Sequence, residues 1–182
     1  MANITLAATG SISAYKAADL TSQLTKLGHK VTVLMSRSAM DFITPLTLQS
    51  LSKNLVHTDV MVEEDPSLIK HIDIAKETDL FLVAPASANT IAKLAHGMAD
   101  NIVTATALAL PIGIPKLIAP AMNTNMYLNP ATQKNLNTLE EYGFDEVKPR
   151  EALLACGDFG TGALAEVTDI LEKVSNTLNE NK

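Results

Sequence analysis

The sequence predicts an α/β fold: a single-domain, doubly wound parallel sheet of the Rossmann or flavodoxin type, with helices on both faces. Short apolar runs alternate with segments of helical periodicity along the chain. These apolar runs are nearly continuous, which is typical of strands buried on both faces of a sheet. The chain has 182 residues, no internal repeat and no low-complexity linker, so we expect one domain over residues 1–182.

In the N-terminal half, each expected strand ends where small polar residues begin. The first strand, ITLAA, ends at Thr9, and the helical pattern after it stops at Gly28. The expected strands cover residues 4–8, 29–35 and 80–84. The expected helices cover residues 11–27 and 89–95.

The C-terminal half continues the alternation of strands and helices. Pro130 and Gly143 mark the first turn and the end of one helix, because proline is favoured at helix starts and glycine beyond helix ends. We expect helices over residues 100–110, 131–142 and 166–178, and strands over residues 116–119 and 146–148.

Composition narrows the class of protein. The chain is 47% hydrophobic and 19% charged, as in globular domains, and its net charge is −6 without a dense basic cluster. Nucleic acid is therefore not an expected partner. No run of 18 apolar residues is present, and no basic segment precedes the N-terminal apolar run. We therefore expect no membrane association and a cytoplasmic location.

The expected sheet predicts where a ligand binds. In open parallel sheets, ligands bind beyond the carboxyl ends of the strands. Four segments that follow expected strands are rich in Ser, Thr, Asn and Gly and poor in charge. They are residues 9–13, 36–38, 85–90 and 120–126. We expect them to line one pocket.

Two of these segments have features of a phosphate site. TGSISAYK lets backbone N–H groups and Ser hydroxyls meet a phosphate at a helix N-terminus, but it is neither GxGxxG nor a P-loop. No acidic residue ends the second strand to bind a ribose, so a mononucleotide is favoured over a dinucleotide. An ordinary strand-to-helix turn fits TGS equally well, and Ser87 or Asn89 fits as a simple helix cap.

Three further features are candidates for chemistry. His71 opens a short helix and suits general-base work near pH 7, although a lone histidine is usually structural or solvent-exposed. GDFGTG at residues 157–162 has no clear strand before it and is interpreted as a mobile flap. Cys156 is the single cysteine, which excludes an internal disulfide and a multi-cysteine metal site; no metal is expected.

The sequence resembles the homo-oligomeric flavin-containing cysteine decarboxylases. The matching motifs are GSISAYK (10–16), HI (71–72), APASANT (84–90), GMADN (97–101), PAMNTNMY (120–127) and ACGDFGTGALAE (155–166). These motifs extend over nearly the whole chain, and the pair PxMNxxM and ACGDxGxG is highly specific. Many bacterial members continue GxGRM, whereas GTGALAE resembles the stand-alone coenzyme A decarboxylases.

The resemblance implies a cofactor, an assembly and site residues. The cofactor is FMN, at a subunit interface of a homotrimer or of a dodecamer of trimers. The implied FMN-binding residues are Gly10, Ser11, Ile12, Ser36, Arg37, Ser38, Ser87, Ala88, Asn89, Thr90 and Ala121. The implied substrate-binding residues are Asn123, Ala155 and Leu164, and the implied catalytic residues are His71 and Cys156. Residues 153–166 are implied to be a flap that covers the substrate.

The implied reaction is the decarboxylation of 4′-phospho-N-pantothenoylcysteine to 4′-phosphopantetheine and CO₂, a lyase step of coenzyme A biosynthesis. The substrate would be oxidised to a thioaldehyde, lose CO₂ and be reduced again as an enethiol. His71 would serve the oxidation, Asn123 would hold the carboxylate as a neutral donor, and Cys156 would supply the final proton. A close Asp158 would keep that thiol protonated.

Other members of related families fit parts of the pattern. The alternatives are a peptidyl-cysteine decarboxylase of lantibiotic maturation, a non-catalytic flavin-binding regulatory subunit and a flavin prenyltransferase. His71, Asn123 and Cys156 are all present without an acidic tail, which favours an enzyme. Only about 26 residues follow Cys156, so we expect a monofunctional decarboxylase whose ligase is a separate protein.

Overall fold

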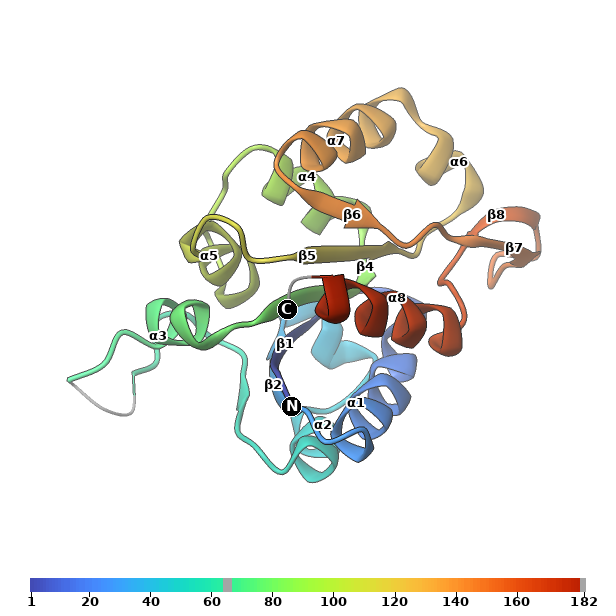
Figure 1. Ribbon diagram of the computed structural model, residues 1–182. Coiled ribbons are helices and arrows are strands. Elements are labelled where there is room, and N and C mark those ends of the chain that lie inside the picture. Colours follow the sequence, from blue (N-terminus) through green and yellow to red (C-terminus); the bar gives the residue numbers. More distant parts are fainter. Residues whose placement is uncertain (64–66, 181–182) are drawn as a thin grey trace.

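The computed structural model describes residues 1–63 and 67–180 of the chain. Six parallel strands form one sheet in the order β3-β2-β1-β4-β5-β6 (Figure 1). They are β1 (Asn3–Ala8), β2 (Lys30–Met35), β3 (Val56–His57), β4 (Leu80–Ala86), β5 (Lys116–Pro120) and β6 (Phe144–Glu146). The strand order changes direction at β1, so the predicted doubly wound fold is confirmed.

Helices cover both faces of this sheet (Figure 1). One face is covered by α1 (Lys16–Lys26), α2 (Pro45–Ser52) and α8 (Val167–Glu180). The other is covered by α3 (Lys70–Glu77), α4 (Ala88–Ala95), α5 (Ile102–Ala109) and α7 (Pro130–Glu141). Three short helices follow strand ends: the 3₁₀ helices η1 (Ile12–Tyr15) and η2 (Arg37–Asp41), and α6 (Thr124–Leu128).

Strand β4 shows why the apolar runs are continuous. Leu80, Leu82 and Ala84 point into the core beneath α1 and α8, whereas Phe81 and Val83 point into the core beneath α4 and α7. All five side chains have no exposed surface. Because successive side chains of a strand point to opposite faces, a strand covered on both faces needs apolar residues at every position.

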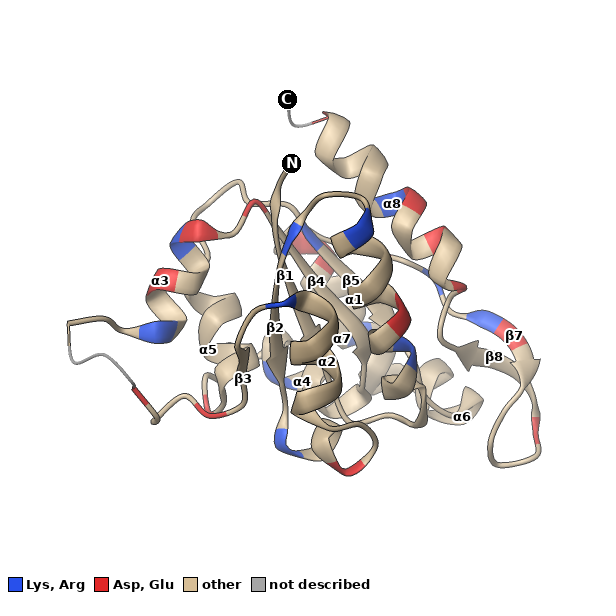
Figure 2. Ribbon diagram, turned by 90° about the horizontal axis from the view of Figure 1, so that it is seen from below, with Lys and Arg blue, Asp and Glu red and all other residues tan. Residues whose placement is uncertain are grey.

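A separate two-stranded antiparallel sheet, called the ribbon below, projects beside the carboxyl edge of the main sheet (Figures 1 and 2). It consists of β7 (Arg150–Leu153) and β8 (Phe159–Ala163). The expectation that no strand leads into the glycine-rich flap was therefore wrong. Glycine is uncommon in strands, so the three glycines of GDFGTG obscured β8 in the sequence.

Smaller differences concern element boundaries. Strand β6 lies two residues before the expected strand at 146–148, and β4 continues to Ala86. Residues 124–128, expected in a loop, form α6, whose N-cap is Asn123. Neither α2 nor β3 was predicted from the sequence.

Within residues 1–63 and 67–180, no helix combines the length and apolar character that a membrane span requires.

Candidate active site

Four capped helix N-termini meet at the carboxyl edge of the sheet. They follow β2, β1, β4 and β5, which are neighbours in the sheet. At each cap a side-chain oxygen accepts a hydrogen bond from a backbone N–H of the helix; the caps are Ser36, Ser11, Ser87 and Asn123. The four polar segments predicted to form one pocket therefore start at the same edge.

Thr9 ties two of these loops together beneath the surface. Its hydroxyl donates to the carbonyl oxygen of Pro85 at 2.7 Å and accepts from the backbone N–H of Ser87 at 2.8 Å. Thr9 is fully buried. Next to it, Gly10 lies so close to Ser38 that a Cβ atom would overlap the serine side chain. The loops after β1, β2 and β4 therefore form one packed unit.

A cavity of about 490 Å³ opens between these loops and the β7–β8 ribbon. Ten of the predicted site residues line it: Gly10, Ser11, Ile12, Ser87, Ala88, Ala121, Asn123, Ala155, Cys156 and Leu164. Six predicted residues lie outside this lining: Ser36, Arg37, Ser38, His71, Asn89 and Thr90. Of these, Ser38 lies beside Gly10, and Thr90 donates its backbone N–H to Ser87 at 3.3 Å.

Asn123 and Cys156 meet across the cavity. The side-chain amide of Asn123 donates to Cys156 Sγ at 3.3 Å, and the thiol donates to Asp158 Oδ2 at 3.4 Å. Asn123 Oδ1 accepts from the backbone N–H of Asn125 at 2.8 Å, which leaves the NH₂ group directed at the ribbon. Asp158 therefore lies close to Cys156, as predicted from the sequence.

Sequence reasoning missed two cations of the cavity lining, Lys16 and Arg150. Lys16 Nζ lies 3.6 Å and Arg150 Nε 3.0 Å from the carboxylate of Glu166. Arg150 Nε also donates to the carbonyl oxygen of Leu164 at 3.2 Å. Lys16 is the last residue of the GSISAYK motif, which is a signal that could have identified it, whereas nothing in the sequence around Arg150 marks it as a site residue.

A single chain does not bring His71 to Asn123 and Cys156. His71 is half-buried on α3 and does not line the cavity. Helix α3 and the β7–β8 ribbon lie at opposite ends of the molecule in Figures 1 and 2. Nδ1 of His71 is buried and has no hydrogen-bond partner among the described residues.

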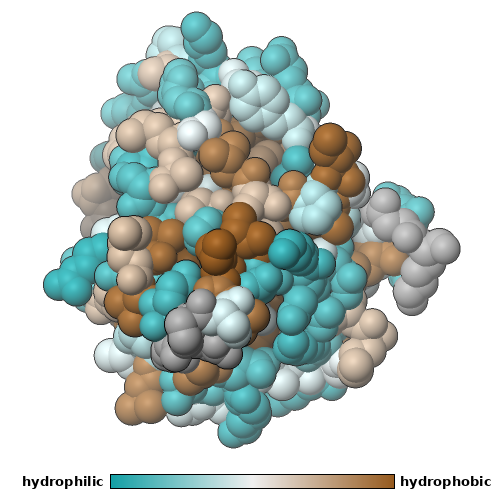
Figure 3. All heavy atoms as spheres, turned by 90° about the vertical axis from the view of Figure 1, so that its left-hand side faces the viewer, coloured by the Kyte–Doolittle hydropathy of each residue, from teal (hydrophilic) through white to brown (hydrophobic). Residues whose placement is uncertain are grey.

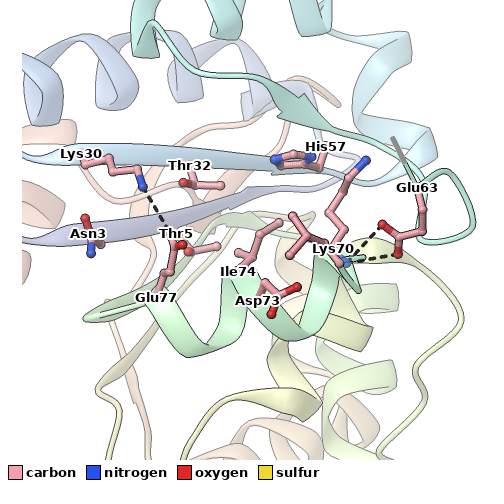
Figure 4. Close-up of a pocket in the computed structure, with 11 residues that line it drawn as sticks. Asn3, Thr5, Lys30, Thr32, His57, Glu63, Lys70, Asp73, Ile74 and Glu77 are labelled. Carbon is pink, nitrogen blue, oxygen red and sulfur yellow. Dashed lines mark hydrogen bonds and ion pairs between the residues drawn. The ribbon is translucent and has the colours of Figure 1, made fainter. Parts of the chain in front are cut away.

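A second cavity, of about 220 Å³, lies between the sheet and α3 (Figure 4). Its lining is rich in charge, but its charged groups bind within the lining or to nearby backbone. Lys30 Nζ lies 3.0 Å from Glu77 Oε2, and Glu63 accepts from the backbone N–H of Lys70 at 3.1 Å. Asp73 Oδ2 accepts from the backbone N–H of Ile69. This balance of charge does not favour a particular ligand.

A polar pair, the buried Tyr127 and the half-buried Glu146, holds helix α6, whose N-cap is Asn123. The hydroxyl of Tyr127 donates to Glu146 Oε1 at 2.9 Å, and Gln133 Nε2 donates to the carbonyl oxygen of Tyr127 at 2.7 Å. Burial raises the pKa of Tyr127 to about 12 and raises the pKa of Glu146 above its ordinary value. The tyrosine is therefore a neutral donor at physiological pH.

The family model described as "Flavoprotein" matches residues 1–179. The chain belongs to this family. It is 60% identical over 175 residues to a "Probable phosphopantothenoylcysteine decarboxylase" of Streptococcus mutans serotype c, covering 96% of this chain and 98% of that protein. It is 46% identical over 170 residues to the "Coenzyme A biosynthesis bifunctional protein CoaBC" of Bacillus subtilis, covering 93% of this chain but 41% of that protein.

Solved structures of similar fold include cysteine decarboxylases. A PPC decarboxylase, a cysteine-to-serine mutant in complex with pantothenoylaminoethenethiol, superposes with a TM-score of 0.88 at 32% identity, covering 98% of both chains. The FMN-dependent cysteine decarboxylase SpaF superposes with a TM-score of 0.86 at 27% identity, covering 99% of this chain and 97% of that one. The similarity expected from the motifs PxMNxxM and ACGDxGxG is confirmed.

Proposed function

We propose that the chain is an FMN-dependent carboxy-lyase that converts 4′-phospho-N-pantothenoylcysteine to 4′-phosphopantetheine and CO₂ in coenzyme A biosynthesis. The contact between Asn123 and Cys156, at the mouth of a cavity on a flavodoxin-like sheet edge, carries this proposal. The full-length similarity to a probable phosphopantothenoylcysteine decarboxylase supports the substrate. We also propose a cytoplasmic location. A relative of this chain is named as a coenzyme A biosynthesis protein, and this location suits a metabolic enzyme of that kind.

The residues at the sheet edge fit FMN. Ser11 and Ser87 present hydroxyls at helix N-termini, where a phosphate is stabilised. Ala121 and Ala88 offer small apolar surfaces to a flat ring. Gly10 brings the second-strand loop, with Ser38, against this cradle. When bound, FMN supplies reversible two-electron oxidation, which neither the thiol nor the amides of this chain can provide.

The chain itself would hold the substrate and move one proton. The Asn123 NH₂ group is a neutral donor for the substrate carboxylate, so it holds this group without strongly stabilising the ground-state negative charge, which must pass to the rest of the substrate when neutral CO₂ leaves. Cys156 would donate the proton that completes the product. Its S–H donates to Asp158 Oδ2 at 3.4 Å beside the cavity.

We propose that His71 acts at a cavity of a neighbouring copy, within a homotrimer or a homododecamer built from trimers. The end of the molecule that carries α3 shows apolar patches among hydrophilic residues (Figure 3). Exposed apolar side chains on this end come from α5 and from the segment before α3: Met61, Val62, Leu68, Ile69 and Leu108. Contiguous exposed apolar surface is typical of interaction sites. A second copy seated there would explain both the patch and the distance of His71 from its own cavity.

Mixing two inactive variants tests this assembly. His71→Asn and Cys156→Ser should each abolish turnover as pure proteins. Co-expression of the two should restore CO₂ release over many turnovers, because some interfaces then combine an intact histidine with an intact cysteine from different chains. A co-expressed oligomer as inactive as the pure variants would place both residues in the site of one chain and contradict the shared site.

The decisive test of the function is purification of the protein, its flavin spectrum and its CO₂ release from phosphopantothenoylcysteine. The wild-type protein should be yellow and active, whereas Cys156→Ser should release CO₂ once and accumulate an enethiol that absorbs in the near ultraviolet. Full turnover by Cys156→Ser would reject the assigned proton donor. A protein that cannot bind FMN would refute the function, and turnover of a peptide with a C-terminal cysteine instead would indicate the peptidyl-cysteine reaction.

A further inference from the structure

The cavity at the sheet edge carries positive charge that the roles above do not use. Lys16 and Arg150 line it, and within residues 1–63 and 67–180 no Asp or Glu does. The chain as a whole has a net charge of −6, so this lining is a local exception to the charge of the molecule. A cleft lined by one sign of charge concentrates ligands of the opposite sign.

One carboxylate holds both cations. Lys16 Nζ lies 3.6 Å from Glu166 Oε2, and Arg150 Nε lies 3.0 Å from Glu166 Oε1. Each carboxylate oxygen thus engages one cation, although Lys16 belongs to α1 and Arg150 to β7. The fold has brought two cations from distant segments to a spacing that a single oxyanion can bridge.

Glu166 balances this pair incompletely. It carries one negative charge against two positive ones, and Asp19 is the other acidic residue among the described residues that line the neighbouring pocket. The Glu166 side chain is 52% exposed, whereas that of Lys16 is 18% exposed. Because exposed ion pairs stabilise a fold only slightly, the carboxylate can turn into water at little cost. A phosphate monoester has a larger charge and three terminal oxygens, so it would bind the two cations more strongly.

We propose that Lys16 and Arg150 bind the 4′-phosphate of the substrate, which displaces Glu166; this assignment rests on the proposed function for the identity of that substrate. Arg150 begins β7, and Cys156 lies in the turn after it. At about 3.3 Å per residue, β7 and the next residue, Leu154, extend roughly 13 Å from Arg150. The phosphate and the thiol are at opposite ends of the pantothenoyl arm, so an extended substrate along β7 reaches both.

FMN carries the same chemical group, a phosphate monoester. Its phosphate is assigned to the hydroxyls and helix N-termini after β1 and β4, where Ser11 and Ser87 lie. The cations instead lie toward the ribbon, where Arg150 is anchored to the carbonyl oxygen of Leu164. An experiment must therefore measure the preference for each phosphate separately.

Calorimetric titration of the flavin-loaded protein with 4′-phosphopantetheine and with pantetheine tests the site directly. The wild-type protein should bind the phosphorylated compound at least about tenfold more tightly. Arg150→Met should reduce this ratio about tenfold or more, and Arg150→Lys should restore part of it. Lys134→Met removes an exposed cation on α7 and serves as the matched control that leaves the ratio unchanged.

Glu166→Gln should act in the opposite direction. It removes the competing carboxylate, so it should raise the preference for 4′-phosphopantetheine. If Glu166 only holds Arg150 in place, Glu166→Gln would lower the preference instead. That result, or an unchanged ratio in Arg150→Met, overturns the inference.

Flavin binding separates the two phosphate sources. Quenching of flavin fluorescence gives the preference of the apoprotein for FMN over riboflavin, and Arg150→Met should keep the wild-type value. A lost FMN preference would assign Arg150 to the cofactor and overturn the inference. Wild-type protein that prefers 4′-phosphopantetheine but releases no CO₂ from phosphopantothenoylcysteine would instead refute the proposed reaction and leave the phosphate site in place.

Discussion

The strand-end loops and the β7–β8 ribbon form two sides of one cavity, but different contacts hold them in place. The loops after β1 and β4 are tied by the buried hydroxyl of Thr9. No residue of β7 or β8 belongs to either apolar core. The ribbon meets the loops through the Met122–Gly162 backbone hydrogen bond and the Asn123–Cys156 contact.

This difference suggests a division of labour between the two sides. Buried hydrogen bonds fix the conformation of the loops, and a rigid site suits a cofactor that stays bound. Few buried contacts hold the ribbon, which suits a segment that admits a substrate and then places Cys156 against it. Variants of the ribbon should therefore alter turnover, whereas variants of the loops should alter flavin affinity and stability.

The largest effect is expected from Gly162→Ala. Gly162 has φ +150°, and a Cβ there would overlap the carbonyl oxygen of Met122. The ribbon must move away from the Asn123 loop, so kcat should fall by roughly a hundredfold, as for a misplacement of about 1 Å, while FMN affinity stays within about twofold. Steady-state kinetics and flavin titration measure both quantities.

A second glycine provides the control for Gly162→Ala. Gly113 also has a positive φ, +92°, but a Cβ there meets nothing within 4 Å. Gly113→Ala therefore introduces backbone strain without a collision, and its kcat should remain near the wild-type value. An equal loss of kcat in both variants would mean that general backbone strain causes the effect. It would contradict the claim that the position of the ribbon controls turnover.

The sequence predicted the loop side of the cavity far better than the ribbon side. Ser11, Ser87 and Asn123 follow apolar runs, and a parallel sheet brings the carboxyl ends of its strands to one edge whatever the details of packing. Arg150 can be recognised as a cavity residue only when the register of β7 against β8 is known. In this register it lies opposite Ala163. Cross-strand pairing in a glycine-rich ribbon leaves no periodic pattern in the sequence.

His71 illustrates a different limit of sequence reasoning. The HI motif matches the family, but α3, which carries His71, lies at the opposite end of the chain's fold from the β7–β8 ribbon (Figure 1). A spacing along the sequence carries no information about contacts between copies. The same holds for Met61 and Leu108, whose exposure becomes evident only in the folded chain.

Thr9→Val tests the loop side with an intermediate effect. Valine has nearly the shape of threonine but leaves the N–H of Ser87 without its buried acceptor. It also removes one of two donors to the carbonyl oxygen of Pro85, which keeps the backbone N–H of residue 9 at 3.2 Å. Unfolding free energy should fall by about 1–3 kcal/mol, and FMN should bind roughly tenfold more weakly. Urea denaturation and flavin titration measure these changes.

The conservative change Thr9→Ser retains the hydroxyl and should recover most of both losses. Unchanged FMN affinity in Thr9→Val, with kcat reduced instead, would contradict the assignment of the loops to the cofactor. It would then be the ribbon, not the loops, that holds the flavin in place.

The smallest effect, and one with a distinctive pH dependence, is expected from Glu146→Gln. Burial raises the pKa of Glu146 in the folded protein above the ordinary value of 4.5, so folding favours the protonated form. The stability from this group is complete below pH 4.5 and is lost as the pH rises through the raised pKa. Glutamine keeps an oxygen that accepts from the Tyr127 hydroxyl, but it lacks the negative charge of the half-buried carboxylate.

The unfolding free energy of Glu146→Gln, relative to that of the wild type, should therefore increase as the pH rises from about 4 to about 8. The increase should be less than about 1 kcal/mol. Urea denaturation across this range measures the difference. Tyr127→Phe is the counterpart, because it leaves the Glu146 carboxylate without its donor and should destabilise the protein most above the raised pKa. A stability difference independent of pH in both variants would mean that α6, and with it Asn123, is held by packing of the tyrosine ring and not by the polar pair.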